Sequence, residues 1–298
     1  MSIINTSYVD ITTFLVGMPG LEYEHIWISI PICSMDLIAV LGNFTILFII
    51  KTEPSLHEPM YYFLSTLAMS DLGLSLSSLP TMLSIFLFNA PEISSNVCFA
   101  QESFIHGFSV LESSVLLIMS FDRFLAIHNP LRYTSILITV RVAQVGIVFS
   151  FKSMFLVLPF PFPLRSLRYC KKNQLSHSYY LHQDVMKLAC SGNRIDVIYN
   201  FFGPLCLMVD FYSHCRTVLG IASKKEQLKA LNTLIIFYLP IINLAIVYHF
   251  AWPVSPIINV LMANVLLLVP PLMNPIVYCV KTKQIRVRVV AKLCQRKI

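Results

Sequence analysis

The chain has 298 residues, of which 56% are apolar and only 12% are charged, and its net charge is +7. Soluble globular domains carry about 25% charged residues, which they need to cover their surface. The composition therefore excludes an ordinary soluble domain and predicts one domain embedded in lipid. In such a protein we interpret the basic residues as determinants of topology and not as a nucleic-acid surface.

Seven apolar segments are long enough for membrane-spanning helices, which need roughly 20 residues each, with a range of about 17–25. In chain order the predicted helices are 27–50, 59–88, 99–123, 140–158, 195–219, 231–250 and 256–280. The clean apolar run of the sixth is only Leu234–Phe250, and Pro204 and Asp210 weaken the fifth. We predict an all-α bundle of seven transmembrane helices over residues 27–280, between an N-terminal segment 1–26 and a tail 281–298.

The basic residues predict the orientation of the bundle. The first 26 residues contain no Lys or Arg, whereas the tail from Lys281 has seven and no acidic residue. The positive-inside rule therefore predicts an external N-terminus and a cytoplasmic tail at the plasma membrane. The loop 159–194 carries six basic residues and is still predicted to be external, because longer loops translocate with less regard to charge.

Three further features fit this topology. Asn5, in the sequence Asn5-Thr6-Ser7, is an N-glycosylation sequon on the predicted outside. Cys170 and Cys190 lie in the external loop, where disulfides persist. In the tail, apolar residues recur every four positions between basic ones, which predicts a short amphipathic helix on the membrane surface. Cys294 beside it is either a palmitoylation site or a free cysteine.

Polar side chains within the spans are costly in lipid and therefore mark functional sites. They are Asn43, Asp71, Glu112, Asp122, Arg123 and Asn274. Asp71 and Glu112 fall near the middle of their helices, where two carboxylates need a counter-ion, a proton or water. Pro275 frees a backbone carbonyl in the seventh helix, which we expect Asn274 or water to satisfy.

These residues belong to motifs whose order and spacing resemble class A G-protein-coupled receptors. The motifs are Gly42-Asn43, Leu67-Ala68-Met69-Ser70-Asp71, Asp122-Arg123-Phe124 and Asn274-Pro275-Ile276-Val277-Tyr278. The longer runs Pro59–Leu64, Met119–Ile127, Asn129–Tyr133 and Pro270–Tyr278 resemble the signatures of olfactory receptors. The segments Leu175–Cys190 and Thr217–Ser223 resemble the class I, or fish-like, branch.

The resemblance implies a rhodopsin-like receptor that binds small odorants and activates a heterotrimeric, stimulatory olfactory-type G protein, which raises cyclic AMP. It implies that Asp122 and Arg123, with Tyr278, form the inactive-state latch and the G-protein contact. It also implies an internal polar site of Asn43, Asp71, Glu112 and Asn274, which holds either a sodium ion or only structural water.

An odorant pocket is expected in the outer half of the bundle. His106, Ser109, Val110 and Ser113 share one face of the third helix, since they are spaced i, i+3, i+4 and i+7. By family position this face lines the pocket, although a polar face also serves helix packing. His182 and Gln183 of the external loop are candidate lid residues.

The sequence departs from the family in two places. The family's external loop supplies three cysteines, the middle one bridging to the third helix, but Tyr180 stands at that position here. Cys98 thus lacks its usual partner: either Cys170 pairs with Cys190, or Cys98 pairs with one of them. Helices five and six also have fewer residues between their motifs than the family pattern.

The shortening suggests an alternative function, a receptor relic that folds but signals poorly. A small transporter or channel is disfavoured, because the sequence has no inverted repeat and no polar stripe over several helices. An enzyme is disfavoured too, because HExxH, GxSxG and P-loop motifs are all missing. We expect lipid, odorant and G protein as partners.

Overall fold

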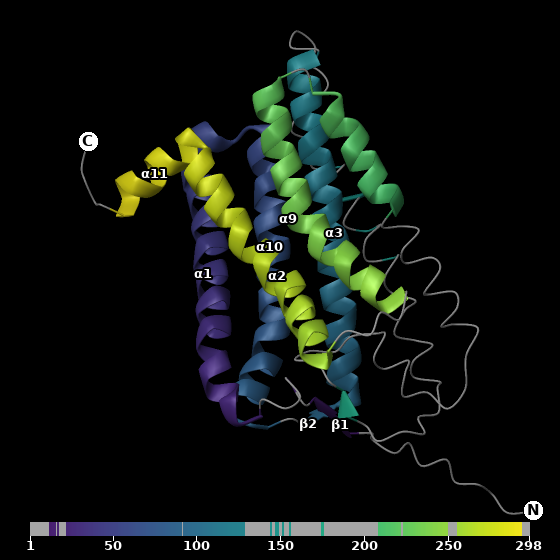
Figure 1. Ribbon diagram of the computed structural model, residues 1–298. Coiled ribbons are helices and arrows are strands. Elements are labelled where there is room, and N and C mark those ends of the chain that lie inside the picture. Colours follow the sequence, from purple (N-terminus) through teal and green to yellow (C-terminus); the bar gives the residue numbers. More distant parts are fainter. Residues whose placement is uncertain are drawn as a thin grey trace, which may run out of the picture.

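The computed structural model describes residues 12–15, 17, 22–90, 92–128, 174–175, 208–221, 223–249 and 255–293, with isolated positions between 144 and 155. Its long helices pack into a bundle in which α10 runs obliquely across α1, α2 and α3 (Figure 1). They are α1 (His25–Thr52), α2 (Pro59–Phe86), α3 (Ser95–His128), α9 (Lys224–His249) and α10 (Pro256–Lys281). Residues 208–219 form a further helix, and the short α11 (Lys283–Leu293) follows α10.

The helices bury polar groups and expose apolar ones, the reverse of a protein in water. On α1, Trp27, Phe44 and Phe48 are exposed, whereas Asp36 and Asn43 are buried. Three helical stretches of the described residues are long and apolar enough to cross a membrane: His25–Thr52, Asn96–Ala126 and Ile257–Tyr278. Lipid is the solvent that such a surface fits.

Two clusters of buried apolar side chains hold the helices together. The cluster at the end where α1 begins includes Ile32, Leu74, Phe86, Ile105, Val260 and Leu267. The cluster at the opposite end includes Ile46, Leu67, Leu116, Leu234, Tyr238 and Ile285. Both clusters combine α1, α2, α3 and α10, so these four helices form a continuous packing unit.

Gly42 allows α1 and α10 to approach closely. A Cβ atom added at Gly42 would lie 2.8 Å from Cβ of Pro275. Next to it, the Asn43 side-chain amide donates to the carbonyl of Pro271 at 2.9 Å. These two contacts fix how α1 and α10 are aligned along their length.

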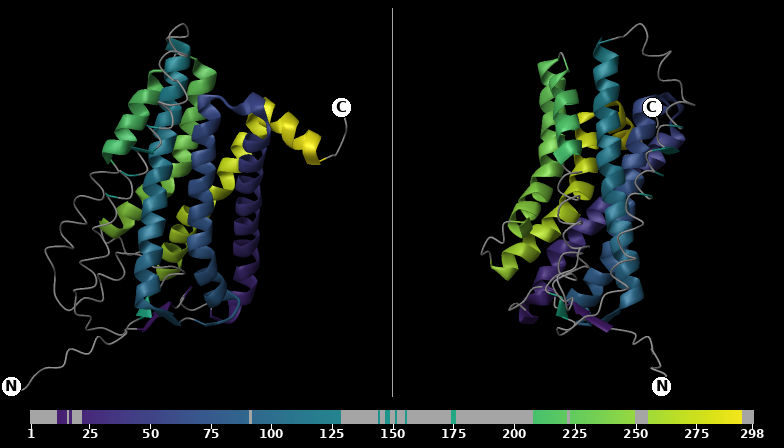
Figure 2. Two further views of the ribbon diagram at one scale, coloured as in Figure 1. Left: turned by 180° about the vertical axis from the view of Figure 1, so that it is seen from behind. Right: turned by 90° about the vertical axis from the view of Figure 1, so that its right-hand side faces the viewer.

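A small sheet, which the sequence did not predict, caps the end of the bundle opposite α11 (Figure 2). Its strands are β1 (Thr12–Leu15), β2 (Glu92–Ser94) and β3 (Gln174–Leu175), in the order β2-β1-β3. β1 pairs antiparallel with β2 and parallel with β3. The N-terminal segment thereby connects the start of α3 to the segment around Gln174.

The predicted amphipathic tail helix is confirmed as α11, which turns away from the bundle (Figure 1). Ile285 is fully buried and Val289 packs beside it. Arg288 and Lys292 each lie 3.5 Å from a carboxylate oxygen of Glu53, just after α1. The Tyr61 hydroxyl of α2 donates to Gln284, so α11 is docked on the turn between α1 and α2.

Helix boundaries differ from prediction mainly where polar residues continue a helix. The predicted helix 99–123 is too short, because α3 extends from Ser95 to His128. The predicted sixth helix 231–250 is also wrong at its start. α9 begins at Lys224, since the Lys, Glu and Gln residues of 224–229 are good helix formers.

α9 therefore has 26 residues, and only its apolar part, Ala230–Asn243, is short. The helices predicted over 27–50, 59–88 and 256–280 are confirmed, with ends that differ by two residues or fewer. Most of the predicted fourth helix and external loop, and the first part of the fifth helix, fall outside the described residues.

Gly42→Ala tests the close approach of α1 to α10. The added methyl meets a rigid proline ring on a packed helix, so we expect a loss of about 1–3 kcal/mol in stability. The measurement is the midpoint of thermal unfolding of the purified protein in detergent. Leu41→Ala, at an exposed position next to it, is the control and should change the midpoint little. Equal midpoints for Gly42→Ala and the unmodified protein would contradict the packing described here.

Candidate functional site

One buried amide connects two buried carboxylates at the centre of the bundle. Nδ2 of Asn274 donates to Oδ1 and Oδ2 of Asp71 at 3.2 and 3.1 Å. The same nitrogen lies 3.0 Å from Oε1 of Glu112. Asp71 is 0% and Glu112 is 1% exposed. Three of the four residues predicted for the internal polar site thus lie together, one each from α2, α3 and α10.

Asn43, the fourth residue of the predicted site, donates to backbone carbonyls of α1 and α10 instead. Pro275 has no N–H, so the carbonyl of Pro271, four residues earlier, loses its helical donor. Asn43 Nδ2 donates to that carbonyl at 2.9 Å and to the carbonyl of Ala39 at 3.0 Å. Asn43 and not Asn274 therefore supplies the side-chain donor to this carbonyl, because the Asn274 amide is used by the two carboxylates.

The cluster contains more acceptor oxygen than donor hydrogen. Asn274 offers a single side-chain NH₂ group to two carboxylates, and Oδ1 of Asn43 has no hydrogen-bond partner among the described residues. A carboxylate pair in a water-poor interior is stable only when a proton, a cation or water compensates it. Carboxylate and amide oxygens are the ligands that hard cations prefer, so these residues fit a sodium ion.

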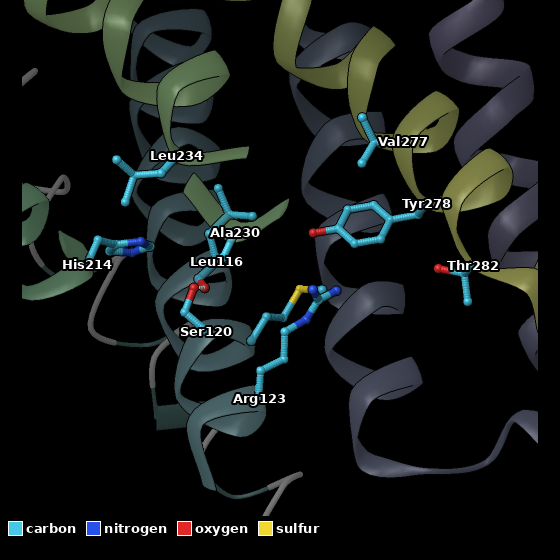
Figure 3. Close-up of a pocket in the computed structure, with 10 residues that line it drawn as sticks. Leu116, Ser120, Arg123, His214, Ala230, Leu234, Val277, Tyr278 and Thr282 are labelled. Carbon is cyan, nitrogen blue, oxygen red and sulfur yellow. Dashed lines mark hydrogen bonds between the residues drawn. The ribbon is translucent and has the colours of Figure 1, made fainter. Parts of the chain in front are cut away.

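A cavity of about 60 Å³ lies toward the α11 end of the bundle, between α3, α9, α10 and the helix 208–219. Its lining includes Arg123, Tyr278, His214, Ser120, Leu234 and Thr282. In Figure 3 the Arg123 side chain from α3 and the Tyr278 ring from α10 both point into this space. Two of the predicted activation residues are thus brought together at one cavity. Asp122 beside them is buried.

A hydrogen-bonded group links α3 to α9 and to the helix 208–219. Oγ of Ser113 lies 2.8 Å from the hydroxyl of Tyr238. A ring nitrogen of His214 lies 3.1 Å from the backbone carbonyl of Ser113. The His214 and Tyr238 rings are in edge contact, with centroids 5.4 Å apart. Ser113 was predicted as a pocket residue, but its hydroxyl is engaged in this link.

The other predicted pocket residues have mixed outcomes. His106, Ser109 and Val110 are half-buried on α3, and the continuous helix places them on one face with Ser113. His182 and Gln183, predicted as a lid, lie outside the described residues, as do Asn5, Cys170 and Cys190. Cys98 is fully buried near the start of α3.

Comparison with known proteins establishes the family. The profile of the olfactory receptor family matches residues 32–296. The chain is 85% identical to human olfactory receptor 51A4 over 313 aligned positions, which cover 100% of both proteins. It is 62% identical to human olfactory receptor 51A7, over 98% of each. The chain belongs to the olfactory receptor family.

Within that family it falls in the class I branch of G-protein-coupled olfactory receptors, as the motifs indicated. It is a receptor and not an enzyme, and it is a multi-pass protein of the plasma membrane. The family as a whole senses odorants and couples to G proteins. The alignment to receptor 51A4 has 313 positions and this receptor has 298 residues, so about 15 positions fall on gaps in this receptor.

The sequence analysis missed Tyr238 and His214 as residues of the receptor's polar interior. The sequence could have indicated Tyr238, because its hydroxyl is a polar group inside an apolar run that also contains Phe237 and Pro240. His214 lies in a predicted span and is the kind of polar residue that should have been questioned. Neither position reveals its partner without the fold.

A double-mutant cycle tests the link between α3 and α9 in the receptor. Ser113→Ala and Tyr238→Phe each remove one partner of the 2.8 Å hydrogen bond, and the double variant removes both. We expect a coupling free energy of about 0.5–1.5 kcal/mol in thermal or denaturant unfolding. Ser114→Ala is the matched control, because among the described residues the Ser114 hydroxyl donates within its own helix, to the Val110 carbonyl. Additive effects for Ser113 and Tyr238 would refute the link.

Proposed function

We propose that the chain is a seven-span odorant receptor that couples to a stimulatory olfactory-type G protein and raises cyclic AMP. The observation that carries this proposal is the cavity at the α11 end, lined by Arg123 and Tyr278 from two different helices. It is bounded by α9 and the helix 208–219. A G-protein segment that entered the cavity would separate these helices from α3.

The proposed topology places the N-terminus and the sheet outside, and the α11 end in the cytoplasm. It is supported by the basic residues of α11 and by the lack of Lys or Arg in the first 26 residues. Residues 27–280 form the seven-helix domain, with the loop 159–194 and a glycosylated Asn5 outside. A disulfide from Cys98 to Cys170 or Cys190 would hold that loop near α3, whereas a disulfide between Cys170 and Cys190 would close the loop on itself.

The proposed odorant pocket lies in the outer half of the bundle, against His106, Ser109 and Val110 of α3, with His182 and Gln183 as a lid. Ser113 stands at its inner end and connects it to Tyr238 and His214. An odorant acts only if it binds the active arrangement more tightly than the inactive one. A change in the contact between Ser113 and Tyr238 would move α9 relative to α3. Odorant binding would in this way alter the cytoplasmic cavity, which α9 and α3 both line.

The internal site of Asn43, Asp71, Glu112 and Asn274 is proposed to hold sodium in the inactive receptor. The ion would neutralise part of the carboxylate charge and stabilise the contacts of α2 and α3 with α10. Asp122 and Arg123 are proposed to form the inactive-state latch at the cytoplasmic end of α3. Loss of both constraints would accompany activation.

An odorant screen tests this function. The receptor is expressed with an olfactory stimulatory G protein, odorants are screened for a cyclic AMP response, and surface receptor is measured with an N-terminal epitope tag on intact cells. Arg123→Ala should lower the maximal response at least tenfold at equal surface expression. Lys51→Ala removes an exposed basic residue at the end of α1 and should keep the response. An unchanged response of Arg123→Ala would refute the proposed coupling site.

The alternative is a receptor that folds but signals poorly. The positions that this receptor lacks in the alignment with receptor 51A4 support this alternative. It is tested by replacing residues 195–250 with the corresponding segment of human olfactory receptor 51A4. A gain of surface expression or of cyclic AMP response in the chimera, with none in the unmodified chain, would support the alternative. A response of the unmodified chain equal to that of the chimera would exclude it.

A further inference from the structure

A third buried carboxylate lies on α1, apart from the Asn274 cluster. Asp36 is only 2% exposed, and its Oδ2 atom has no hydrogen-bond partner among the described residues. A carboxylate oxygen buried in a lipid-embedded bundle is costly unless a cation, a proton or water compensates it. Oδ2 of Asp36 therefore needs a compensating group that the described side chains do not provide.

The alignment of α1 with α10 determines what Asp36 faces. Asp36 precedes Asn43 by seven residues, which is almost two helical turns, so both lie on the same face of α1. Asn43 contacts the Pro271 carbonyl. α1 and α10 run in the same direction, so Asp36 lies opposite the stretch of α10 about 10 Å before Pro271. Ile32 shares a core cluster with Leu267, so the two helices stay in contact there.

That stretch of α10 carries a backbone acceptor without its helical donor. Pro271 has no N–H, so the carbonyl of Leu267, four residues earlier, cannot form its usual hydrogen bond within the helix. Residues four apart lie on the same side of a helix, so this carbonyl is on the side of α10 that receives Asn43. Along the axis it lies about 6 Å before the Pro271 carbonyl, within one turn of the level of Asp36.

We propose that Asp36 and the Leu267 carbonyl bind a monovalent cation, with sodium as the probe, in the seam between α1 and α10. Both groups are acceptors, and a set of hard oxygen ligands without donors is what such an ion requires. A water molecule alone would satisfy lone pairs but would leave the charge of Asp36 uncompensated. The site is separate from the Asp71 and Glu112 cluster, because Asp36 lies about 10 Å outward of Asn43 along α1.

The test uses the purified full-length receptor in detergent and needs no odorant. The midpoint of thermal unfolding is measured while sodium chloride replaces N-methyl-D-glucamine chloride at constant ionic strength. The midpoint of the unmodified receptor should rise with sodium, and Asp36→Asn should lose at least half of that rise. Ser34→Ala should keep this rise, because Ser34 is exposed on α1 and its hydroxyl donates, within the described part of the chain, to the Pro31 carbonyl of its own helix. An equal rise for Asp36→Asn and the unmodified receptor would overturn the proposal.

Two proline variants test the second proposed ligand, the Leu267 carbonyl, and can be used if Asp36→Asn does not fold. Pro271→Ala restores an N–H for the Leu267 carbonyl and should raise the sodium concentration for the half-maximal effect at least threefold. Pro270→Ala is the matched control, because the carbonyl that it satisfies, that of Leu266, lies about 100° around the helix from that of Leu267. Equal effects of the two variants, or a midpoint that follows pH and not sodium, would overturn the cation site.

Discussion

The shared hydrogen bond of Asn274 with Asp71 and Glu112 is the interaction on which the arrangement of the bundle depends. Two consecutive helices, α2 and α3, meet the distant α10 at one amide nitrogen, within 3.2 Å of each carboxylate. In lipid there is no hydrophobic driving force between helices, because the lipid tails are equally apolar, so close packing and hydrogen bonds hold the helices together. Buried polar groups that find partners only in one arrangement therefore determine which helix faces lie together. Asn274 has this role for α2, α3 and α10.

The prolines of α10 extend this constraint to α1. A proline removes a backbone donor, and the carbonyl left behind must find a partner in a neighbouring helix. Asn43 supplies it for Pro271, and Gly42 allows the approach that makes this contact possible. The apolar residues on the opposite side of α1, such as Phe44 and Phe48, are exposed to lipid. Asn43 thus provides a polar contact between α1 and α10, and Asp36 is buried nearer the start of α1, apart from the Asn274 cluster.

The sequence predicted the helices that are delimited by apolar runs. The predictions were wrong or missing where helix propensity of polar residues or pairing of distant strands determines the structure. α1 and α10 agree with prediction within two residues, because their apolar runs end at charged residues and prolines. α3 and α9 are longer than predicted, since polar residues with good helix propensity prolong a helix beyond the lipid-facing part. The sheet was not predicted, because its strands have two to four residues and pair across large sequence separations.

The site was only partly predictable for a related reason. Asp71, Glu112 and Asn274 stand out in the sequence, because they are polar residues in apolar spans. Their roles as donor and acceptors follow from residue type, and the structure brings them together as expected. The partner of Asn43 and the hydrogen bond from Ser113 to Tyr238 depend on how two helices are rotated and aligned. No local pattern in a single sequence contains that information.

The most direct measurement of the central claim is an exchange of the two residues that connect α2 and α10. Asn274→Asp alone removes the shared donor and places a third carboxylate beside Asp71 and Glu112, so the midpoint of thermal unfolding and the surface expression should fall sharply. Asp71→Asn added to it restores one amide and one carboxylate across the same contact. The double variant should recover at least half of the loss. A double variant no better than Asn274→Asp alone would show that this contact does not hold the bundle together.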